Sequence, residues 1–402
     1  MSAAYDAARR GYHVTVLDAS PADREGCSFG NAGMIVPSHV VPLAAPGAVA
    51  LGLKWMWNPE SPFYIKPRLS TELLRWGWHF WRNASQKHVD RSAPILRDLH
   101  MSSRSLYESW RESLGDFGLT QRGLIMFCAT QHALDEEAHG AELARRLGLE
   151  ADVLTAAQLR DLEPDLTMNV VGGVLHRQDC HLNPNELMRL LRQRMVELGG
   201  ELRHRSTVKE FRSQGGRILA AVTDTDVIEA DQFVIAGGVW SSPLARSLRL
   251  KIPMQAGKGY SLTLEHPREL PRYCSILTEA RVAVTPIGSR LRFGGTMALT
   301  GRDESILPPR IRGILNSIPR YFPRFSTEDF AGIQPWVGLR PVAPDGLPYL
   351  GRSRDWRNLV IATGHAMMGV SLAPITGRIV GQLLAGEPTD IDLKLLRPER
   401  FG

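Results

Sequence analysis

An arginine flanked by stiff backbone is the residue best suited to hold a carboxylate. Arg340 lies in the segment 338–348, GLRPVAPDGLP, where two prolines follow it closely. A guanidinium that is held in place can bind a carboxylate through two parallel hydrogen bonds. The segment therefore predicts a site for a small anionic molecule. Taken alone, it would equally suit a surface ion pair.

Two further segments have the residue types that bind a dinucleotide. Asp18 follows the apolar run HVTVL at residues 13–17, where such folds place the acidic residue that binds a ribose hydroxyl. The segment 236–242, AGGVWSS, follows a second apolar run, and its small residues let backbone approach a bulky cofactor. The glycine-rich pyrophosphate turn precedes the acidic residue by about 20 positions. We therefore expect that turn to lie before residue 1. As a lone motif, Asp18 could simply cap a strand.

Charge and cysteine content exclude other kinds of site. The net charge is +6, but no run of five like charges occurs, so we expect no nucleic-acid partner. The four cysteines lie far apart with no C-x-x-C pair. This spacing predicts neither a metal site nor a disulfide framework, and it fits a cytoplasmic protein. At 402 residues, two domains are the default expectation.

The pattern of apolar residues predicts alternating helices and strands around these motifs. Helices are expected over residues 2–10, 88–115, 132–147, 155–161, 185–198 and 373–384. Strands are expected over 13–17, 123–130, 172–176, 201–204, 217–223, 232–236 and 359–362. Short extended segments from about 250 to 330 suggest an antiparallel sheet over a substrate pocket. Residues 20–85 are expected to be mostly loop. The predicted fold class is α/β with mixed α+β character.

One stretch imitates a membrane span. Residues 27–53 contain no Asp, Glu, Lys or Arg, yet three prolines and several polar residues argue for a buried, irregular segment near a ligand. Five of the nine tryptophans lie between Trp55 and Trp81, with lysines and arginines among them. Aromatic and basic side chains together suit a membrane interface. A tryptophan-rich core helix is the alternative.

Six blocks of sequence occur in the same order as in FAD-dependent D-amino acid dehydrogenases. They are SFGNAGMIVP (28–37), PLAAPG (42–47), LKWM (53–56), KGYSLT (258–263), GLRPVAPDGLP (338–348) and NLVIATGHAMMG (358–369). The chain resembles this family from residue 2 to about 398 and, more broadly, the glycine and D-amino acid oxidase superfamily. The resemblance implies a Rossmann-like FAD-binding domain interleaved with an antiparallel-sheet substrate domain. The implied FAD-binding segments are 1–85, 155–245 and 332–402, and the substrate segments are 86–154 and 246–331.

The resemblance also implies roles for individual residues. Arg340 would bind the substrate carboxylate, and Tyr260 and His365 would complete the catalytic site. The implied FAD-binding residues are Asp18, Ser28, Asn31, Ala32, Gly33, Val208, Gly237, Gly238, Gly364, Met368 and Gly369. For His365, a hydrogen-bonded core histidine is an equal alternative. Members of the family begin with a strand and a G-x-G-x-x-G turn, which this sequence lacks before SAAYDAARRG. We therefore expect the chain as given to hold FAD weakly.

The implied reaction is oxidative deamination of D-amino acids to 2-oxo acids and ammonia. Hydride would pass from Cα to flavin N5, with positioning rather than a strong base supplying most of the catalysis. The alternatives are an oxidase or dehydrogenase of D-proline, 4-hydroxy-D-proline, glycine or sarcosine, and a flavin-free remnant that only binds a ligand or partner. The expected electron acceptor is a quinone or another respiratory-chain component. Residues 54–82 would then dock peripherally on the inner membrane face.

Overall fold

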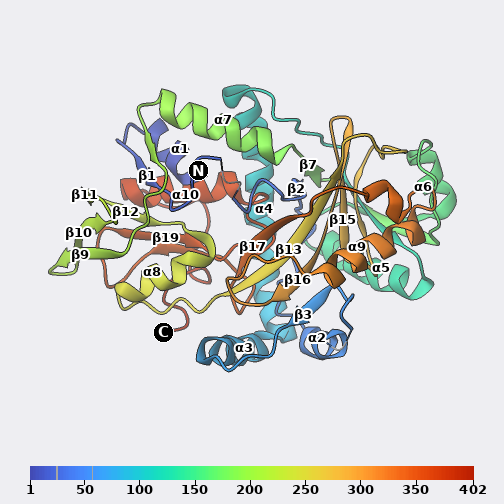
Figure 1. Ribbon diagram of the computed structural model, residues 1–402, viewed down its shortest axis with the longest axis horizontal. Helices are drawn as coiled ribbons and strands as arrows, with labels where there is room; N and C mark the ends of the chain where they lie inside the picture. The colour runs from blue at the N-terminus through green and yellow to red at the C-terminus, as the bar shows by residue number, and fades with distance from the viewer. Residues whose placement is uncertain (24–25, 57) are drawn as a thin grey trace.

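The structure is a computed structural model that describes residues 1–23, 26–56 and 58–402. It has the mixed α/β fold that the sequence predicts (Figure 1). The helices are α1 (Ser2–Arg9), α2 (Ala48–Trp55), α3 (Thr71–Asn83), α4 (Gln86–Leu114), α5 (Gln131–Arg146), α6 (Ala156–Leu162), α7 (Pro184–Glu197), α8 (Ser241–Ser247), α9 (Pro308–Tyr321) and α10 (Ala373–Ala385), with 3₁₀ turns η1 (Gly238–Trp240) and η2 (Thr327–Phe330).

A large sheet forms the centre and right of the molecule in Figure 1. Nine strands of the described residues belong to it, in the order β17-β13-β16-β15-β14-β4-β6-β5 with β3 paired to β16. Their bounds are β3 (Phe63–Ile65), β4 (Leu124–Cys128), β5 (Ala151–Thr155), β6 (Gly172–His176), β13 (Gln255–Leu264), β14 (Cys274–Leu277), β15 (Val282–Ile287), β16 (Arg290–Leu299) and β17 (Trp336–Val342). One face packs on α9 and a large apolar core.

Among the described residues, three smaller sheets lie on the left of the molecule in Figure 1, and a fourth, two-stranded sheet lies near its centre. Two contain parallel pairs: β1 (Thr15–Leu17) beside β8 (Glu201–Arg203), and β12 (Phe233–Ile235) beside β19 (Leu359–Thr363), with β18 (Tyr349–Arg352) antiparallel to β19. The others are β9 (Glu210–Gln214), β10 (Arg217–Val222) and β11 (Val227–Glu229), and the pair β2 (Met34–Ile35) and β7 (Cys180–His181). Helices α1 and α10 pack against each other beside them.

Local signals in the sequence explain where several helices begin and end. The Asn183 side chain accepts hydrogen bonds from the first backbone amides of α7, and Pro184 occupies its first position. Helix α10 ends at Gly386, whose φ of 71° is left-handed. The predicted helices over 185–198 and 373–384 therefore lie within about one residue of α7 and α10.

The segment that was expected to be mostly loop contains two helices. Helix α3 begins at the cap residue Ser70, whose hydroxyl accepts from Leu73 N. Trp76 is buried on its inner side, so the tryptophan-rich segment is helical and partly core. Trp57 lies outside the described residues. The charge-free stretch 27–53 is mainly irregular, and within the part of the chain that is described no helix is long and apolar enough to cross a bilayer.

Hydrogen bonding shows where the predicted domain segments meet. Strands β3, β6 and β17 lie within segments that were expected to bind FAD, yet all three pair into the nine-stranded sheet. Helix α4, 29 residues long, runs between the two halves and contacts α10 and α7. The division into two domains and its boundaries stay predictions.

Candidate active site

A cavity of about 2240 Å³ lies between the small sheets and the nine-stranded sheet. Ligand pockets in proteins typically measure about 300–1,000 Å³, so this cavity has room for more than one small molecule. Its lining comes from α1, β1, the loop 26–33, the 3₁₀ turn η1, β17 and the loop after β19. Segments far apart in the sequence therefore share one site.

Asp18 and Val208 line one end of the cavity. Asp18 directly follows β1, and its Oδ1 accepts a hydrogen bond of 2.9 Å from Ser20 N. This bond orients the carboxylate at the end of a parallel strand, where it can accept from a ribose hydroxyl. Val208 lies just before β9 and adds an apolar wall.

The next part of the lining is backbone-rich. Gly237 and Gly238 follow β12 after Ala236, and Gly238 has a φ of 56°. The Thr363 hydroxyl donates to Gly238 O at 3.0 Å, which ties this turn to β19. The first turn of α1 also faces the cavity and has no side-chain cap. Free amides at a helix N-terminus favour an anionic group such as a pyrophosphate.

The loop 26–33 forms a third side of the cavity. Ser28, Asn31 and Ala32 line it, whereas Gly33 does not. Gly33 shapes the loop instead: its N–H donates to Asn31 Oδ1 at 2.7 Å, and its φ is 73°. A Cβ at this position would lie 2.2 Å from Leu182 O. Only glycine fits there.

Arg292 holds this loop from the nine-stranded sheet. Its Nη1 donates to Phe29 O at 2.8 Å and to Asn31 O at 2.7 Å, and the residue is 6% exposed. Nε donates to Thr263 Oγ1 at 3.1 Å within the sheet. The sheet therefore determines the position of the loop. Sequence reasoning missed Arg292, because an arginine within a strand carries no local sign of its partners.

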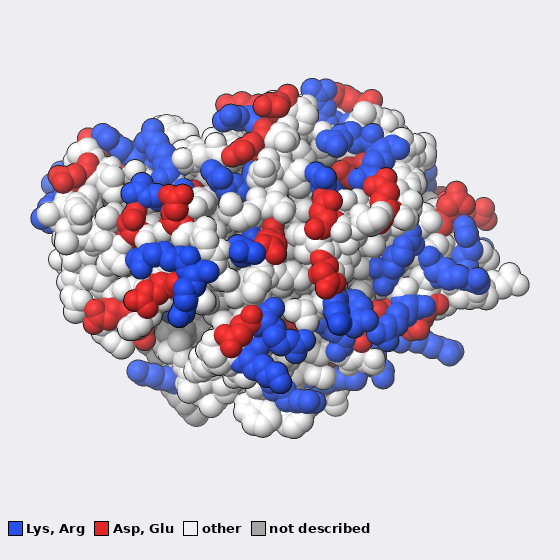
Figure 2. All heavy atoms as spheres, turned by 180° about the vertical axis from the view of Figure 1, so that it is seen from behind, with Lys and Arg blue, Asp and Glu red and all other residues white. Residues whose placement is uncertain are grey.

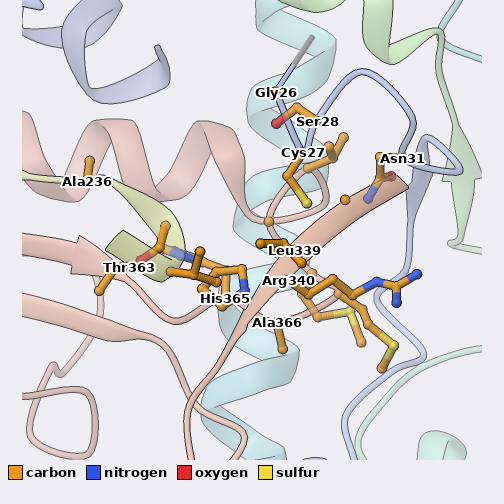
Figure 3. A pocket seen from close by; sticks show the side chains of 18 of the residues that line it. Gly26, Cys27, Ser28, Asn31, Ala236, Leu339, Arg340, Thr363, His365 and Ala366 are labelled. Carbon is orange, nitrogen blue, oxygen red and sulfur yellow. Dashed lines mark hydrogen bonds between the residues drawn. The ribbon is translucent and has the colours of Figure 1, made fainter. Parts of the chain in front are cut away.

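Arg340 extends from β17 into the cavity, below the loop that carries Cys27 and Asn31 (Figure 3). Its Nη1 donates to Thr296 O at 2.7 Å. Burial lowers the pKa of Arg340, and among the described residues no carboxylate forms an ion pair with it. A partly desolvated guanidinium that faces a cavity without an anionic partner favours the binding of a carboxylate.

The loop after β19 lies on the other side of Arg340 in Figure 3. His365, Met368 and Gly369 line the cavity. Burial lowers the pKa of His365 to about 4, so its ring is neutral at pH 7, and Nε2 lies 3.0 Å from Thr376 Oγ1. Gly364 does not line the cavity; its φ is 79°, and it makes the turn that presents His365.

Tyr260 borders the cavity, but its hydroxyl points to a loop. The hydroxyl accepts from Leu307 N at 3.1 Å and lies 3.5 Å from Ser305 O. The neighbouring Lys258 is fully buried and donates to Asp303 Oδ2 at 2.8 Å. Together these side chains fasten the loop 303–307 to β13. A direct catalytic role for Tyr260 stays a prediction.

Cys27 is a cavity residue that sequence reasoning did not select. Its thiol accepts from the backbone N–H of Leu339 and lies near Arg340 (Figure 3). Cys27 is exposed to the cavity, and desolvation by the surrounding walls raises the pKa of its thiol, so it is neutral at pH 7. Its place directly before SFGNAG was the one available signal. All four cysteines are free.

These features suit a dinucleotide cofactor together with a small acid. The carboxylate of Asp18, the uncapped end of α1 and the small residues at 236–238 follow one another along the lining. They match a ribose, a pyrophosphate and a close approach of backbone to a flat ring system. Arg340 supplies the separate site for the acid.

The sequence matches, over residues 1–383, the family described as "FAD dependent oxidoreductase". Among curated proteins, a D-amino acid dehydrogenase from Granulibacter bethesdensis is 30% identical over 412 aligned positions, which cover 100% of this chain and 97% of that protein. A D-amino acid dehydrogenase from Methylobacterium nodulans is 31% identical, with 100% and 96% covered.

Two solved structures share the fold. Glycine oxidase from Geobacillus kaustophilus has a TM-score of 0.79 at 22% identity, covering 100% of this chain and 95% of that chain. L-proline dehydrogenase from P. horikoshii has a TM-score of 0.74 at 18% identity, covering 100% and 94%. At these identities the similarity shows the architecture alone.

Proposed function

Because the chain belongs to the FAD dependent oxidoreductase family, we propose that it binds FAD in this cavity and oxidises D-amino acids to 2-oxo acids and ammonia. It is an enzyme of the oxidoreductase class. The observation that carries the proposal is Arg340, a half-buried guanidinium that faces the cavity without a carboxylate partner among the described residues. The D-amino acid dehydrogenase relatives support the choice of substrate.

The chain's own residues would hold FAD along the cavity. Asp18 would accept from the ribose, Val208 would lie against the adenine, and the first turn of α1 would face the pyrophosphate. The residues proposed to lie along the flavin are Ser28, Asn31, Ala32, Gly237, Gly238, Met368 and Gly369. Gly33 and Gly364 would shape the turns on either side. When bound, FAD supplies the two-electron acceptor for the reaction.

Arg340 would bind the substrate carboxylate and thereby orient Cα. Because the guanidinium is already held by Thr296 O, little side-chain freedom is lost when the acid binds. Orientation of this kind can account for a large part of a rate enhancement. His365, neutral and hydrogen-bonded to Thr376, would be a wall of the same site rather than a base. Tyr260 would close the site through the loop that it holds.

We propose a quinone or another respiratory-chain component as electron acceptor, with peripheral docking on a membrane through α2 and α3. These helices border the cavity with Trp55, Trp76 and Phe80. They also expose large apolar residues to solvent, namely Leu53, Leu74, Trp78 and Trp81, of which Leu53 and Trp81 border the cavity as well. Basic residues accompany them, which suits an anionic lipid surface. A lipophilic acceptor could then reach the cavity from the same side.

The Arg340→Leu variant tests the proposed substrate site. We expect KM for a D-amino acid to rise about 10- to 100-fold, because two charge-assisted hydrogen bonds are lost. The absorbance of bound flavin should stay unchanged. Arg340→Lys retains the charge but cannot form the two parallel hydrogen bonds, so its KM should lie between those of wild type and Arg340→Leu. The panel should include D- and L-amino acids, D-proline, 4-hydroxy-D-proline, glycine and sarcosine, with a dye or oxygen as acceptor.

Each outcome has a distinct meaning. Unchanged kinetics in Arg340→Leu would remove Arg340 from the substrate site. Loss of flavin in this variant would place it in the cofactor site instead. Wild-type protein that shows no flavin absorbance after incubation with FAD would contradict the proposed cofactor. Turnover confined to glycine, sarcosine or a cyclic imino acid would replace the proposed substrate class.

A further inference from the structure

A buried carboxylate lies behind the cavity wall and is bonded to a cavity residue. Asp179 is 1% exposed, and it accepts from Ser38 Oγ at 2.5 Å and from Ser38 N at 2.9 Å. Ser38 itself lines the cavity. The two bonds hold the carboxylate and the hydroxyl in one fixed arrangement. The 2.5 Å bond has the length of a charge-assisted bond between a hydroxyl and a carboxylate.

His39 extends this arrangement into the cavity. Its Nδ1 lies 3.1 Å from Ser38 Oγ, and its ring borders the cavity. Because the Ser38 hydroxyl donates to Asp179, the tautomer that satisfies both bonds has the proton on Nδ1 of His39. Nε2 then has a free lone pair, and within the described residues it has no hydrogen-bond partner.

The surroundings keep the His39 ring neutral. Burial, together with Arg281, lowers the pKa of His39 to about 4. Burial raises the pKa of Asp179 to about 7, against the opposing effect of the Ser38 bonds and Arg104. Other titratable groups that interact with this cluster are His100 from α4, His176 from β6, Cys180 from β7 and Cys274 from β14, and Glu108 from α4 acts on Cys180.

We propose that His39, Ser38 and Asp179 form a proton relay that removes a proton from the ammonium group of the bound amino acid. The inference rests on the proposed function, because it requires an amine substrate in the cavity. An amino acid binds mainly as its ammonium form, which has no lone pair on nitrogen. The carbon–hydrogen bond can break with loss of hydride only after the nitrogen has lost a proton and regained a lone pair.

The relay balances without any further reactant. One ammonium proton passes to His39 Nε2, while the proton on Nδ1 passes to Ser38 Oγ. The hydroxyl proton of Ser38 passes at the same time to Asp179 Oδ2. The substrate becomes a neutral amine, His39 changes tautomer, and Asp179 becomes a neutral acid. The proton returns through the same groups to solvent or to the leaving product.

The relay predicts a defined dependence of kcat/KM on pH. Asp179 must be ionised to receive a proton, so activity should rise with pH and level off above about 7. Without the relay, only substrate that has already lost its proton in solution could react. The inflection of the profile would then move up to the pKa of the substrate ammonium.

The test compares wild-type enzyme with Asp179→Asn, Ser38→Ala and Ser38→Thr, each saturated with FAD, using D-alanine as substrate. In Asp179→Asn and Ser38→Ala we expect kcat/KM at pH 7 to fall at least about tenfold, since general acid–base groups commonly contribute more. The inflection near pH 7 should disappear. Ser38→Thr retains the hydroxyl and should therefore keep kcat/KM at pH 7 and the inflection near pH 7 close to those of wild type.

Glu163→Gln is the matched control. Glu163 is likewise 1% exposed, burial likewise raises its pKa, and it accepts from Arg272 N and Tyr273 N, none of which lines the cavity. This variant should keep the wild-type pH profile. Should Asp179→Asn fail to fold, Ser38→Ala still tests the relay. It removes the hydroxyl that the relay requires, and it should fold because the backbone bond from Ser38 N to Asp179 remains.

The outcomes separate the relay from the proposed function. If wild-type enzyme oxidises D-alanine and Ser38→Ala retains its pH profile, the relay is wrong while the proposed function stands. If wild-type enzyme binds FAD but oxidises no D-amino acid in the panel, the proposed function itself fails. A profile that shifts equally in Glu163→Gln would show a general effect of buried carboxylates and would also overturn the relay.

Discussion

Gly259 makes room for Arg340, the residue on which the proposed substrate site depends. The two residues lie on neighbouring strands, β13 and β17. A Cβ at position 259 would lie 2.0 Å from Nη1 of Arg340, far inside van der Waals contact. The absence of a side chain at one position therefore permits the orientation of another. No property of Arg340 alone indicates this dependence.

We predict that Gly259→Ala displaces Arg340 without unfolding the protein. The clash is with the movable end of a long side chain, so the guanidinium should leave Thr296 O and lose its orientation. KM for the substrate should rise about 10- to 100-fold, as for Arg340→Leu, with flavin absorbance retained. Steady-state kinetics and absorption spectra measure both.

Gly77→Ala is the control for this change. A Cβ at Gly77, within α3, would meet no atom within 4 Å. Alanine should therefore leave KM unchanged and stabilise the helix by roughly 0.5–1 kcal/mol. Equal KM values in wild type and Gly259→Ala would contradict the predicted displacement.

At the scale of elements, two segments of the cavity wall depend on partners outside themselves. The loop 26–33 is held by Arg292 through two backbone carbonyls, and the loop 303–307 is held by Lys258 and Tyr260. Both anchors belong to the nine-stranded sheet. The sheet is therefore the rigid support of the site, and the loops supply its chemistry.

Helix α3 has two different sides. Trp76 is 5% exposed and donates from Nε1 to Val342 O at 2.9 Å, which anchors the helix. Leu74, Trp78 and Trp81, spaced four and three residues apart, are 72%, 54% and 59% exposed. Figure 2 shows another face of the molecule, where acidic and basic residues are mixed. An exposed apolar stripe on a helix suits a membrane surface.

We predict that the double variant Leu74→Ser, Trp78→Ser binds vesicles of phosphatidylglycerol and phosphatidylcholine less well than wild type. The loss should be at least about tenfold, since each buried large apolar side chain contributes about 1.5–3 kcal/mol. Neither residue lines the cavity, so turnover with a soluble dye should persist. Sedimentation with vesicles measures the binding.

Exposed apolar residues on the small sheet of β9, β10 and β11 provide the control. Leu219 and Val227 are 43% and 44% exposed on β10 and at the start of β11. Changing both to serine should leave vesicle binding unaltered. If the α3 variant sedimented with vesicles as wild type does, the docking face would be abandoned.

At the scale of the whole molecule, several histidines are buried in neutral form. Burial lowers the pKa of His100 to about 3 and those of His176 and His181 to about 4. Each has one ring nitrogen that is buried without a hydrogen-bond partner among the described residues. In the unfolded chain the same side chains have a pKa near 6.5 and gain protons first as pH falls.

We therefore predict that the free energy of unfolding decreases as pH falls from about 6.5 towards 4. In this window the unfolded state binds more protons than the folded state, so the free energy of unfolding decreases as pH decreases. Each histidine contributes about 1.4 kcal/mol per pH unit. Asp179, with its pKa raised to about 7, is already protonated in the folded state and offsets about one histidine. Urea unfolding at pH 7 and pH 5 measures the difference.

A variant of an exposed histidine separates this effect from general acid sensitivity. The His132 side chain is 84% exposed, so His132→Gln should leave the pH dependence unchanged. His181→Asn should make it shallower. Equal free energies of unfolding at pH 7 and pH 5 in the wild-type chain would show that the buried histidines do not govern acid stability.

Local sequence signals predict much of the architecture. Helices α7 and α10 follow from their caps and apolar spacing, and β6 coincides with the predicted strand at 172–176. Residues 20–85 were expected to be mostly loop, with a tryptophan-rich core helix as one reading of residues 55–81; helix α3, with Trp76 buried, agrees with that reading. Gly33 and Gly364, which the resemblance implies as FAD-binding residues, do not line the cavity. Both shape turns behind the wall, because their positive φ values serve the backbone.

Short segments of the sequence already contain the residue types that the proposed chemistry needs, but they do not show how these residues are arranged in space. The types and order of residues in GLRPVAPDGLP, SFGNAG and the strand end at Asp18 already indicated an acid site and a dinucleotide site. Only the tertiary structure brought Arg292 to the loop 26–33 and Asp179 to Ser38, across separations of 261 and 141 residues. Such contacts depend on strand register and on buried hydrogen bonding between distant segments. These hydrogen bonds form only when distant segments pack together in the folded core, so no local sequence pattern predicts them.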